Sequence, residues 1–548
     1  MKQRLSLLAA ALFLLAFLVD VRQVQAADAV VGNGNPASCT EAAFDAALAA
    51  AVGGTITFNC GPATTTISFT LTKIVNLGNV TIDGGGRIVL RAGANERHFF
   101  AGTGVTFSLQ NITLREGDSL VSGGAVEASG ANVILTNVQL LDNASTVNGG
   151  AIYCFDGALT IVNSLLQNNS AGEAGGALFN DGCTVTITGS TLHGNRALSA
   201  FGRGGAIDNR PGGTLTMNST ALQENRATDG GGLYVNSGAT AVLAGVTFTA
   251  NGGGYGGGVE NSGALTVTGS LFDGNTVTGS GGGLWNQSGA AVVARTTFRS
   301  NRAYEGGGVN SYGNQLELTD VNLTGNVATD GHGGGLYHSS GTVFVTNATI
   351  SDNHAESSAS YGGGIYQSAD DNLVLTNVTL ANNQAGGLGG GLYHYGRYAI
   401  LTNVTIANNT AGIAGNAIYE DSPMTPASPG VVQMINSVIL GSANNCDGGL
   451  FQSLGHNISQ GTCAALSDPT DQENFGGDLL LGPLAYNGGA FVMQTRLPAS
   501  GSPLIDAADA SSCLPYDQRR ASRVGACDIG AVEYGALAHA LYLPAVLR

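Results

Sequence analysis

Hydrophobic and polar residues alternate in short runs along most of this chain, and closely related runs return many times. Residues 401–406 read LTNVTI, and similar runs stand at 375–380 and 345–350. Alternation at a period of two places successive side chains on opposite faces of an extended backbone, whereas a helix needs a period near 3.6. The pattern therefore predicts short β-strands that are half buried.

A glycine-rich run followed by an aliphatic residue marks each repeat, at steps of 25 to 29 residues. We call the aliphatic residues the markers: Val126, Ile152, Leu178, Ile207, Leu233, Val259, Leu284, Val309, Leu336, Ile365, Leu392 and Ile418. An asparagine recurs between successive markers and is usually preceded, three places earlier, by Leu, Ile or Phe. We call these residues the corner asparagines: Asn143, Asn169, Asn195, Asn225, Asn251, Asn275, Asn301, Asn326, Asn353, Asn383 and Asn409.

The repeat has no helical segment, so it does not fit the strand–helix units of leucine-rich or ankyrin proteins. One turn per repeat, with each strand parallel to its counterpart in the next turn, predicts an all-β fold, a single-stranded right-handed parallel β-helix. Asparagine tolerates the left-handed backbone of a tight corner, and amides stacked about 4.8 Å apart can hydrogen-bond as a ladder. We expect the glycines at a second corner, where positive φ or close backbone approach excludes a Cβ atom.

Two families share motifs with this sequence. Over about residues 79–440 the chain resembles the polymorphic outer membrane proteins, which implies a bacterial surface β-helix, a pectin-lyase-like solenoid, that serves adhesion. The motifs are GGAI at 149–152 and 204–207, FTAN at 248–251, FDGN at 272–275 and FRSN at 298–301. The C-terminal part resembles the choice-of-anchor Q module, which implies association with a cell surface. Its matching residues are Tyr486–Gly489, Gly501–Ala507, Asp517–Arg519 and Cys527–Glu533.

These features divide the chain into five expected segments. They are a signal peptide at 1–26, an N-terminal cap at 27–54, the β-helix at 55–440, a C-terminal module at 441–535 and a tail at 536–548. Ser38 and Glu41 form a capping-box pattern ahead of Phe44 and Leu48, which predicts a cap helix. We expect the C-terminal module to close the other end of the coil, after a proline-rich loop at Pro423–Pro429.

Composition and charge narrow the function classes. The apolar run from Leu5 to Val19 is too short to span a bilayer and predicts export to the cell surface or the medium. Eight cysteines in an exported chain favour disulfides, and proximity suggests Cys39–Cys60, Cys154–Cys183, Cys446–Cys463 and Cys513–Cys527. A formal net charge of −17 disfavours nucleic acid and anionic lipid. The sequence has no EF-hand loop and no zinc spacing, so it predicts no cofactor, and calcium stays an untested alternative.

Candidate chemistry stands in the two positions that follow each marker. The first should face outward and carries a strip of aromatic residues that could bind an extracellular glycan or a neighbouring cell: Trp285, Tyr337, Tyr366, Tyr393 and Tyr419. The alternative is that these rings stack only on one another. The second position should face inward and includes His338 and His394, too far apart for one zinc ion.

An enzyme is the runner-up. Asp208 and Glu260 share the outward position two coils apart, about 9 to 10 Å, at the upper limit for an inverting glycosidase. Gly331-His332-Gly333 is similar to a polygalacturonase motif, but Asp370-Asp371 follow it, whereas that family places its aspartates before it. We therefore expect a non-catalytic β-helix for adhesion or glycan binding, with a polysaccharide-active enzyme and a purely structural fibre as alternatives.

Overall fold

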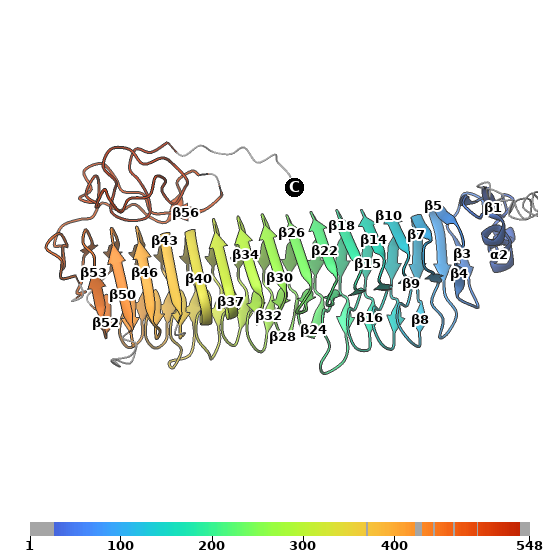
Figure 1. Ribbon diagram of the computed structural model, residues 1–548, viewed down its shortest axis with the longest axis horizontal. Coiled ribbons are helices and arrows are strands. Elements are labelled where there is room, and N and C mark those ends of the chain that lie inside the picture. The colour runs from blue at the N-terminus through green and yellow to red at the C-terminus, as the bar shows by residue number, and fades with distance from the viewer. Residues whose placement is uncertain are drawn as a thin grey trace, which may run out of the picture.

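The structure, a computed structural model, describes residues 27–368, 371–421, 430–441, 444–463, 466–489 and 491–537. The expected signal peptide at 1–26, the loop at Pro423–Pro429, Asp370 and most of the expected tail lie outside the described residues. The described chain forms a long parallel β-solenoid of about 16 turns, and it confirms the predicted right-handed β-helix. At about 4.8 Å per turn the solenoid is roughly 77 Å long. Figure 1 shows this rod from the side.

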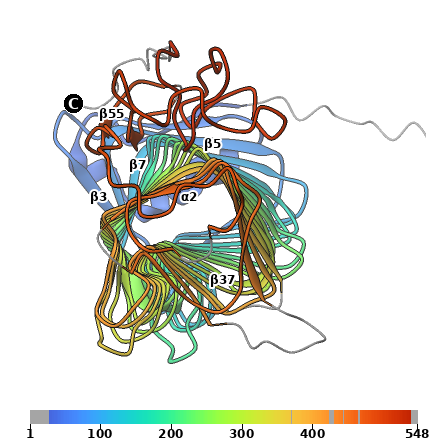
Figure 2. The same cartoon turned by 90° about the vertical axis from the view of Figure 1, so that its left-hand side faces the viewer.

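Each turn contains up to four strands, and every strand lies parallel to its counterpart in the neighbouring turns. One complete turn is β13 (Ile152–Phe155), β14 (Ala158–Val162), β15 (Leu165–Gln167) and β16 (Ser170–Ala171). Its register to the next turn pairs Ile152 with Leu178 and Leu159 with Val185. The turns superpose when the rod is viewed along its axis (Figure 2). Because the register keeps one residue above its equivalent, equivalent side chains form columns along the rod.

The strands that carry the markers, together with their in-register equivalents at the two ends of the rod, form the first position of the turn. They are β4 (Lys73–Val75), β6 (Phe99–Ala101), β9 (Val126–Ser129), β13, β17 (Leu178–Asp181), β21 (Ile207–Asn209), β25 (Leu233–Val235), β29 (Val259–Asn261), β33 (Leu284–Asn286), β37 (Val309–Thr319), β40 (Leu336–Ser351), β42 (Ile365–Gln367), β45 (Leu392–His394), β49 (Ile418–Glu420) and β52 (Cys446–Gly448).

The second position holds longer strands, some of which run on into the third. They are β1 (Ala29–Val31), β2 (Thr55–Phe58), β5 (Asn79–Arg91), β7 (Thr106–Arg115), β10 (Asn132–Thr136), β14, β18 (Thr184–Thr188), β22 (Thr214–Asn218), β26 (Thr240–Ala244), β30 (Ala264–Thr268), β34 (Ala290–Ala294), β43 (Asn372–Ala381), β46 (Tyr398–Thr402), β50 (Val431–Ile435) and β53 (Phe451–Ser453).

The third and fourth positions hold short strands. The third are β3 (Thr65–Ser68), β11 (Gln139–Leu141), β15, β19 (Thr191–His193), β23 (Ala221–Gln223), β27 (Thr247–Thr249), β31 (Leu271–Asp273), β35 (Thr297–Arg299), β38 (Asn322–Thr324), β47 (Thr405–Ala407), β51 (Val438–Leu440) and β54 (Ile458–Ser459). The fourth are β8 (Asp118–Ser119), β12 (Ala144–Ser145), β16, β20 (Arg196–Ala197), β24 (Arg226–Asp229), β28 (Gly252–Tyr255), β32 (Thr276–Val277), β36 (Arg302–Ala303), β39 (Val327–Ala328), β41 (His354–Ala355), β44 (Gln384–Ala385) and β48 (Thr410–Ala411).

The core of the rod is built from the inward residues of these columns. All the markers are fully buried, as the alternation predicts. Three phenylalanines from successive turns stack inside it, with ring centroids 4.7 Å apart for Phe248 and Phe272 and 4.5 Å apart for Phe272 and Phe298. The solenoid thus grows by one layer per repeat and needs no single large core.

The corner asparagines form the predicted amide ladder. From Asn143 to Asn409, each Nδ2 donates to the Oδ1 atom of the next corner asparagine at 2.9 to 3.0 Å. The backbone conformation differs from the prediction, because the left-handed residue is the one before each asparagine. These residues have φ of 54° to 65°: Asp142, Asn168, Gly194, Glu224, Ala250, Gly274, Ser300, Gly325, Asp352, Asn382 and Asn408. The left-handed residue turns the chain, and the asparagine that follows points its amide into the core.

The glycine runs serve a second corner, as expected. Gly389 has φ of 66°, and a Cβ atom on the next residue, Gly390, would lie 2.5 Å from the carbonyl oxygen of Asn416. The first glycine therefore supplies the left-handed conformation, and the second allows adjacent turns to approach closely.

Helix α2 (Glu41–Ala50) caps the N-terminal end and buries Phe44 and Ala47 against the first turns. A 3₁₀ turn, η1 (Pro36–Ser38), precedes it. The predicted capping box is wrong in its residues, because the N-cap is Thr40, whose Oγ1 accepts a hydrogen bond from the Ala43 amide at 3.2 Å. Glu41 instead accepts from Lys73 Nζ at 2.6 Å.

All four predicted disulfides are present: Cys39–Cys60, Cys154–Cys183, Cys446–Cys463 and Cys513–Cys527. Cys154 and Cys183 are fully buried within the rod, while Cys513–Cys527 lies in the C-terminal module. Among the residues that the structure describes, no helix has the length and the apolar character needed to cross a lipid bilayer.

The C-terminal segment departs from its predicted role as an end cap. The β-helix continues past residue 440 through β52, β53 and β54, and Cys463 and Leu466 join its core. The following chain, with the antiparallel pair β55 (Ala485–Tyr486) and β56 (Gln494–Thr495), folds back along the flank of the rod (Figure 1). The flank module, as we call residues 482–537, therefore covers the side of the later turns.

Hydrogen bonds hold the flank module to columns of the third strand position. The Gln518 side chain donates to the Ala348 carbonyl and accepts from Thr379 Oγ1 at 2.6 Å. Arg520 pairs with Asp320, with Nη2 2.7 Å from Oδ2. Single-residue contacts of this kind have no sequence period, so the repeat pattern could not reveal the docking.

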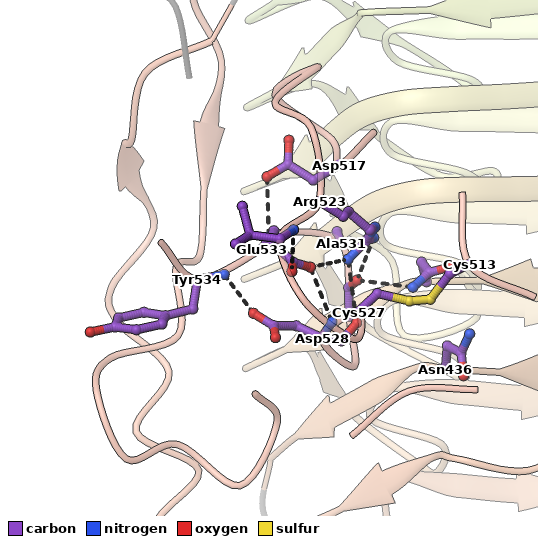
Figure 3. A network of polar contacts seen from close by, with 12 residues as sticks. Asn436, Cys513, Asp517, Arg523, Cys527, Asp528, Ala531, Glu533 and Tyr534 are labelled. Carbon is purple, nitrogen blue, oxygen red and sulfur yellow. Dashed lines mark hydrogen bonds and ion pairs between the residues drawn. A yellow bond between two sulfur atoms is a disulfide. The ribbon is translucent and has the colours of Figure 1, made fainter. Parts of the chain in front are cut away.

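Inside the flank module, a buried ionic network lies beside a small apolar cluster that includes Leu504 and Ile529 (Figure 3). Arg523 Nη1 lies 2.9 Å from Glu533 Oε2, and Glu533 also accepts from the amides of Val524 and Asp528 at 3.0 Å. Burial raises the pKa of Asp528 to about 6. Arg523, Asp528 and Glu533 thus make their polar contacts within the module itself.

Candidate functional site

The four tyrosines of the predicted aromatic strip form a continuous stack along the first strand position. Ring centroids lie 5.0 Å apart for Tyr337 and Tyr366, 5.0 Å for Tyr366 and Tyr393, and 5.8 Å for Tyr393 and Tyr419, with the planes within 15° of parallel. The turn spacing of a β-helix matches the offset stacking distance of aromatic rings. Each inner ring of this row therefore has its two faces in contact with its neighbours.

Loops that precede the glycine runs fold over the same row. His332 stacks on Tyr366 at 4.4 Å, and Tyr361 stacks on Tyr393 at 4.9 Å. Tyr393 is only 4% exposed, and its hydroxyl donates to Asp421 Oδ2 at 2.6 Å. Burial lowers the pKa of His332 and raises the pKa of Tyr393. The expectation that this column is an open platform is wrong for Tyr393, whereas Tyr337, Tyr366 and Tyr419 are half-buried.

Trp285, the first member of the strip, has a different setting. Tyr255, at the end of β28, contacts it with the ring centroids 4.7 Å apart and the ring planes tilted by 30°, while the next residue of the column is the buried Asn310. A shallow open hollow lies beside the indole, lined by Trp285, Gln287, Ser288 and Tyr312. Tyr312 is 61% exposed. We call these four residues the aromatic shelf.

Sequence reasoning missed Tyr312 because it does not occupy the column of the other aromatic residues. The register between β37 and β40 shifts on both sides of Tyr312, where the chain bulges outward. A bulge breaks the alternation and rotates a side chain away from its expected face. The adjacent Gly313, inside an otherwise regular strand, was the signal that could have indicated this bulge.

Asp208 and Glu260 lie in one column with Tyr234 between them in register, as predicted. Their exposure contradicts the prediction, because Asp208 is 0% and Glu260 1% exposed. The turn at Asp208 carries a longer loop, and Arg203 of that loop lies over the Tyr234 ring, 5.0 Å from its centroid. A polysaccharide chain cannot reach these two carboxyl groups in this conformation.

The burial of these carboxyl groups changes their ionisation. Asp208 Oδ1 accepts from Asn236 Nδ2 at 2.5 Å, while Asp208 Oδ2 and Glu260 Oε2 have no hydrogen-bond partner among the described residues. Burial raises the pKa of Asp208 to about 6, against the opposing charge of Arg210, and raises the pKa of Glu260 well above its usual value. Burial therefore disfavours the charged form of both carboxyl groups.

The next column faces inward, as predicted, and its polar side chains bond to one another. Asn180 Nδ2 donates to Asn209 Oδ1 at 2.6 Å, and Asn261 Nδ2 to Asn286 Oδ1 at 2.8 Å. His394 Nδ1 contacts Glu420 Oε2 in the buried interior, and Gln367 separates His338 from His394 in register. The described part of the chain holds no group of three or more His, Cys, Asp or Glu residues placed to bind a metal ion.

Comparisons with known proteins agree with the fold. The family profile described as "Right handed beta helix region" matches residues 176–350 and 272–422, which together span less than half of the chain. The chain is thus a right-handed β-helix repeat protein. No curated protein matches the sequence at a significant level.

Two solved structures are similar at low scores. The pectate lyase Pel9A is 13% identical, with 93% of this chain and 97% of that chain covered and a TM-score of 0.19. The PL6 family alginate lyase AlyGC is 10% identical, with 82% and 100% covered and a TM-score of 0.15. At these TM-scores neither likeness bears on the function of this chain.

Proposed function

We propose that the protein is a secreted or cell-surface, non-catalytic β-helix that binds neutral glycans on the aromatic shelf. The observation that carries this proposal is the open hollow beside Trp285, where a half-buried indole and the exposed Tyr312 ring meet the side chains of Gln287 and Ser288. Aromatic faces pack against the apolar face of a sugar ring, and amide and hydroxyl groups bond its hydroxyls. The shelf supplies both kinds of contact in one place.

Charge and burial favour this function over the alternatives. The net charge of −17 disfavours long polyanions over most of the surface, so neutral sugars are the expected class for the shelf. The burial of Asp208 and Glu260 favours binding over a polysaccharide-active enzyme, because a general acid must reach the glycosidic oxygen. Four disulfides support an oxidising location, and the resemblances to polymorphic outer membrane proteins and the choice-of-anchor Q module support a bacterial surface.

The test begins with a glycan array on the purified protein, followed by calorimetric titration of the best neutral oligosaccharide. We expect Trp285→Ala and Tyr312→Ala each to weaken binding about tenfold or more, as a buried aromatic contact is worth roughly 1 to 3 kcal/mol. The matched control is Tyr395→Ala, a tyrosine that is 43% exposed and lies outside the shelf.

A second arm separates the shelf from the stacked tyrosines. The double variant Tyr366→Ala with Tyr393→Ala should leave the affinity unchanged if the shelf alone binds, after its folding has been checked by circular dichroism. Loss of binding in this variant, with Trp285→Ala unaffected, would place the glycan on the tyrosine stack instead. A protein that binds no glycan on the array would leave the structural fibre as the function and refute the proposal.

A further inference from the structure

Two arginines stand directly opposite each other on adjacent turns, in the fourth strand position. In the pairing of β20 with β24, Arg196 is in register with Arg226, and both residues are exposed. Like charges directly opposite each other on neighbouring strands destabilise a sheet. A negative group between the two side chains would relieve this repulsion.

The chain supplies that negative group at comparable places. Arg302 lies in the same column and pairs with Glu356, with Nη2 2.8 Å from Oε2 and Nη1 3.1 Å from Oε1. Among the described residues, Arg196 and Arg226 make no ion pair. They therefore differ from Arg302 in lacking a carboxylate of the protein itself.

A second arginine pair in the same protein shows how the bridge is made. Arg91 and Arg115 are also in register on adjacent strands, β5 and β7. Glu116 lies between them, with Oε1 2.9 Å from Arg115 Nη2 and Oε2 in contact with Arg91 Nη2. One carboxylate thus neutralises two guanidinium groups one turn apart, each through one charge-assisted contact.

The site around Arg196 and Arg226 is a polar depression and not a flat surface. Its lining includes Asn168, Ser170 and His193 besides the two arginines. Glu224 is the acid in this lining, but its side chain is 65% exposed and Oε2 lies 3.7 Å from His193 Nε2. The depression thus presents amide, hydroxyl and imidazole groups around two arginines, with the exposed Glu224 carboxylate also in its lining.

We propose that this depression binds a carboxylate group, in the way that Glu116 bridges Arg91 and Arg115, and that its ligand is a uronic-acid sugar. The overall charge of −17 does not oppose this, since charges beyond about 10 Å are screened at 0.1 M salt and the two arginines act locally. Asn168 and Ser170 are placed to bond the hydroxyls of the same sugar. The site is separate from the aromatic shelf, and the proposal does not depend on glycan binding there.

The experiment uses the full chain and two matched probes, the trimer of glucuronic acid and the trimer of glucose, titrated by calorimetry or followed by NMR. We expect the acidic trimer to bind and the neutral trimer not to bind at this site. Arg196→Gln and Arg226→Gln should each weaken the binding of the acidic trimer about tenfold, as expected for one charge-assisted hydrogen bond. Raising the salt concentration should weaken it further.

Three controls make the outcome decisive. Arg302→Gln removes an arginine that is already paired and should leave the affinity unchanged, while Glu224→Gln removes a competing carboxylate and should increase it. Acetate is the third control. A site that binds any free carboxylate should bind acetate and the trimer of glucuronic acid equally well, whereas a site that also recognises the sugar should bind the trimer more tightly. The proposal is overturned if the acidic trimer does not bind at millimolar concentration, if the neutral trimer binds equally well, or if the double arginine variant, with an unchanged melting temperature, binds like the parent.

Discussion

The amide ladder should be the feature of this protein most sensitive to a single substitution. Asn275 stands at its centre with 0% exposure. Its Nδ2 donates to the Phe248 carbonyl at 3.0 Å and to Asn301 Oδ1 at 2.9 Å. Its Oδ1 accepts from the backbone and side-chain N–H groups of Asn251 at 2.9 and 3.0 Å. The variant Asn275→Leu removes all four of these hydrogen bonds.

The size of the effect follows from the partners left behind. Asn301 Oδ1 still accepts the backbone amide of residue 275, at 3.0 Å in the parent. The Phe248 carbonyl and two N–H groups of Asn251 lose a buried partner, at about 1 to 3 kcal/mol each. Burial of the leucine side chain offsets part of this loss. We expect the free energy of unfolding to fall by roughly 3 to 6 kcal/mol.

Equilibrium unfolding in urea, followed by circular dichroism, measures this loss as a lower midpoint. The matched control is Gly274→Ala, one residue earlier, where φ is 63° and a Cβ atom would meet no neighbour within 4 Å. That variant carries only the cost of a left-handed alanine, about 1 kcal/mol. If Asn275→Leu unfolds at the parent midpoint, or is no less stable than Gly274→Ala, the ladder does not stabilise the rod as argued.

Two further predictions concern the buried carboxyl groups and the flank module. The folded-state pKa of Asp208 is raised to about 6 from a usual 3.8, so its protonation stabilises the native state, and this contribution is lost as the pH rises from about 4 through 6. Asp208→Asn should therefore be more stable than the parent by roughly 1 to 3 kcal/mol at pH 7 and equal to it near pH 4. Urea unfolding midpoints measured across this pH range test the difference. Parallel pH profiles of stability for the parent and the variant would contradict the raised pKa of Asp208. Gln518→Ala should make the flank module more sensitive to limited proteolysis, because Ala348, Thr349 and Thr379 lose their hydrogen bonds to this side chain. The surface control is Tyr516→Ala. If Gln518→Ala is digested at the same rate as the parent and this control, these hydrogen bonds do not hold the module.

The sequence by itself determined the features that repeat. Strand alternation and a constant step predicted the turn of the β-helix, the inward direction of markers such as Leu284 and the amide ladder. The proximity of the cysteines along the chain predicted the disulfide pairs. These features depend on short-range geometry, because a period of two fixes the face of each side chain and a parallel register stacks equivalent residues. Each repeat therefore specifies the same local structure.

Only the tertiary structure decided which outward residues are accessible. The loops before the glycine runs differ from turn to turn, and they cover Asp208, Glu260 and Tyr393 while leaving Trp285 beside an open hollow. The bulge at Tyr312 completes the shelf.

The position of the flank module and the open arginine pair also lay beyond the sequence pattern. The module docks through single contacts between residues far apart in the chain, such as Arg520 with Asp320. Glu116 bridges Arg91 and Arg115, whereas among the described residues Arg196 and Arg226 make no ion pair. Lateral packing and the proximity of charges do not follow the period of the repeat. The sequence pattern therefore determines the coil, whereas only the folded structure shows which surfaces of the coil remain open to a ligand.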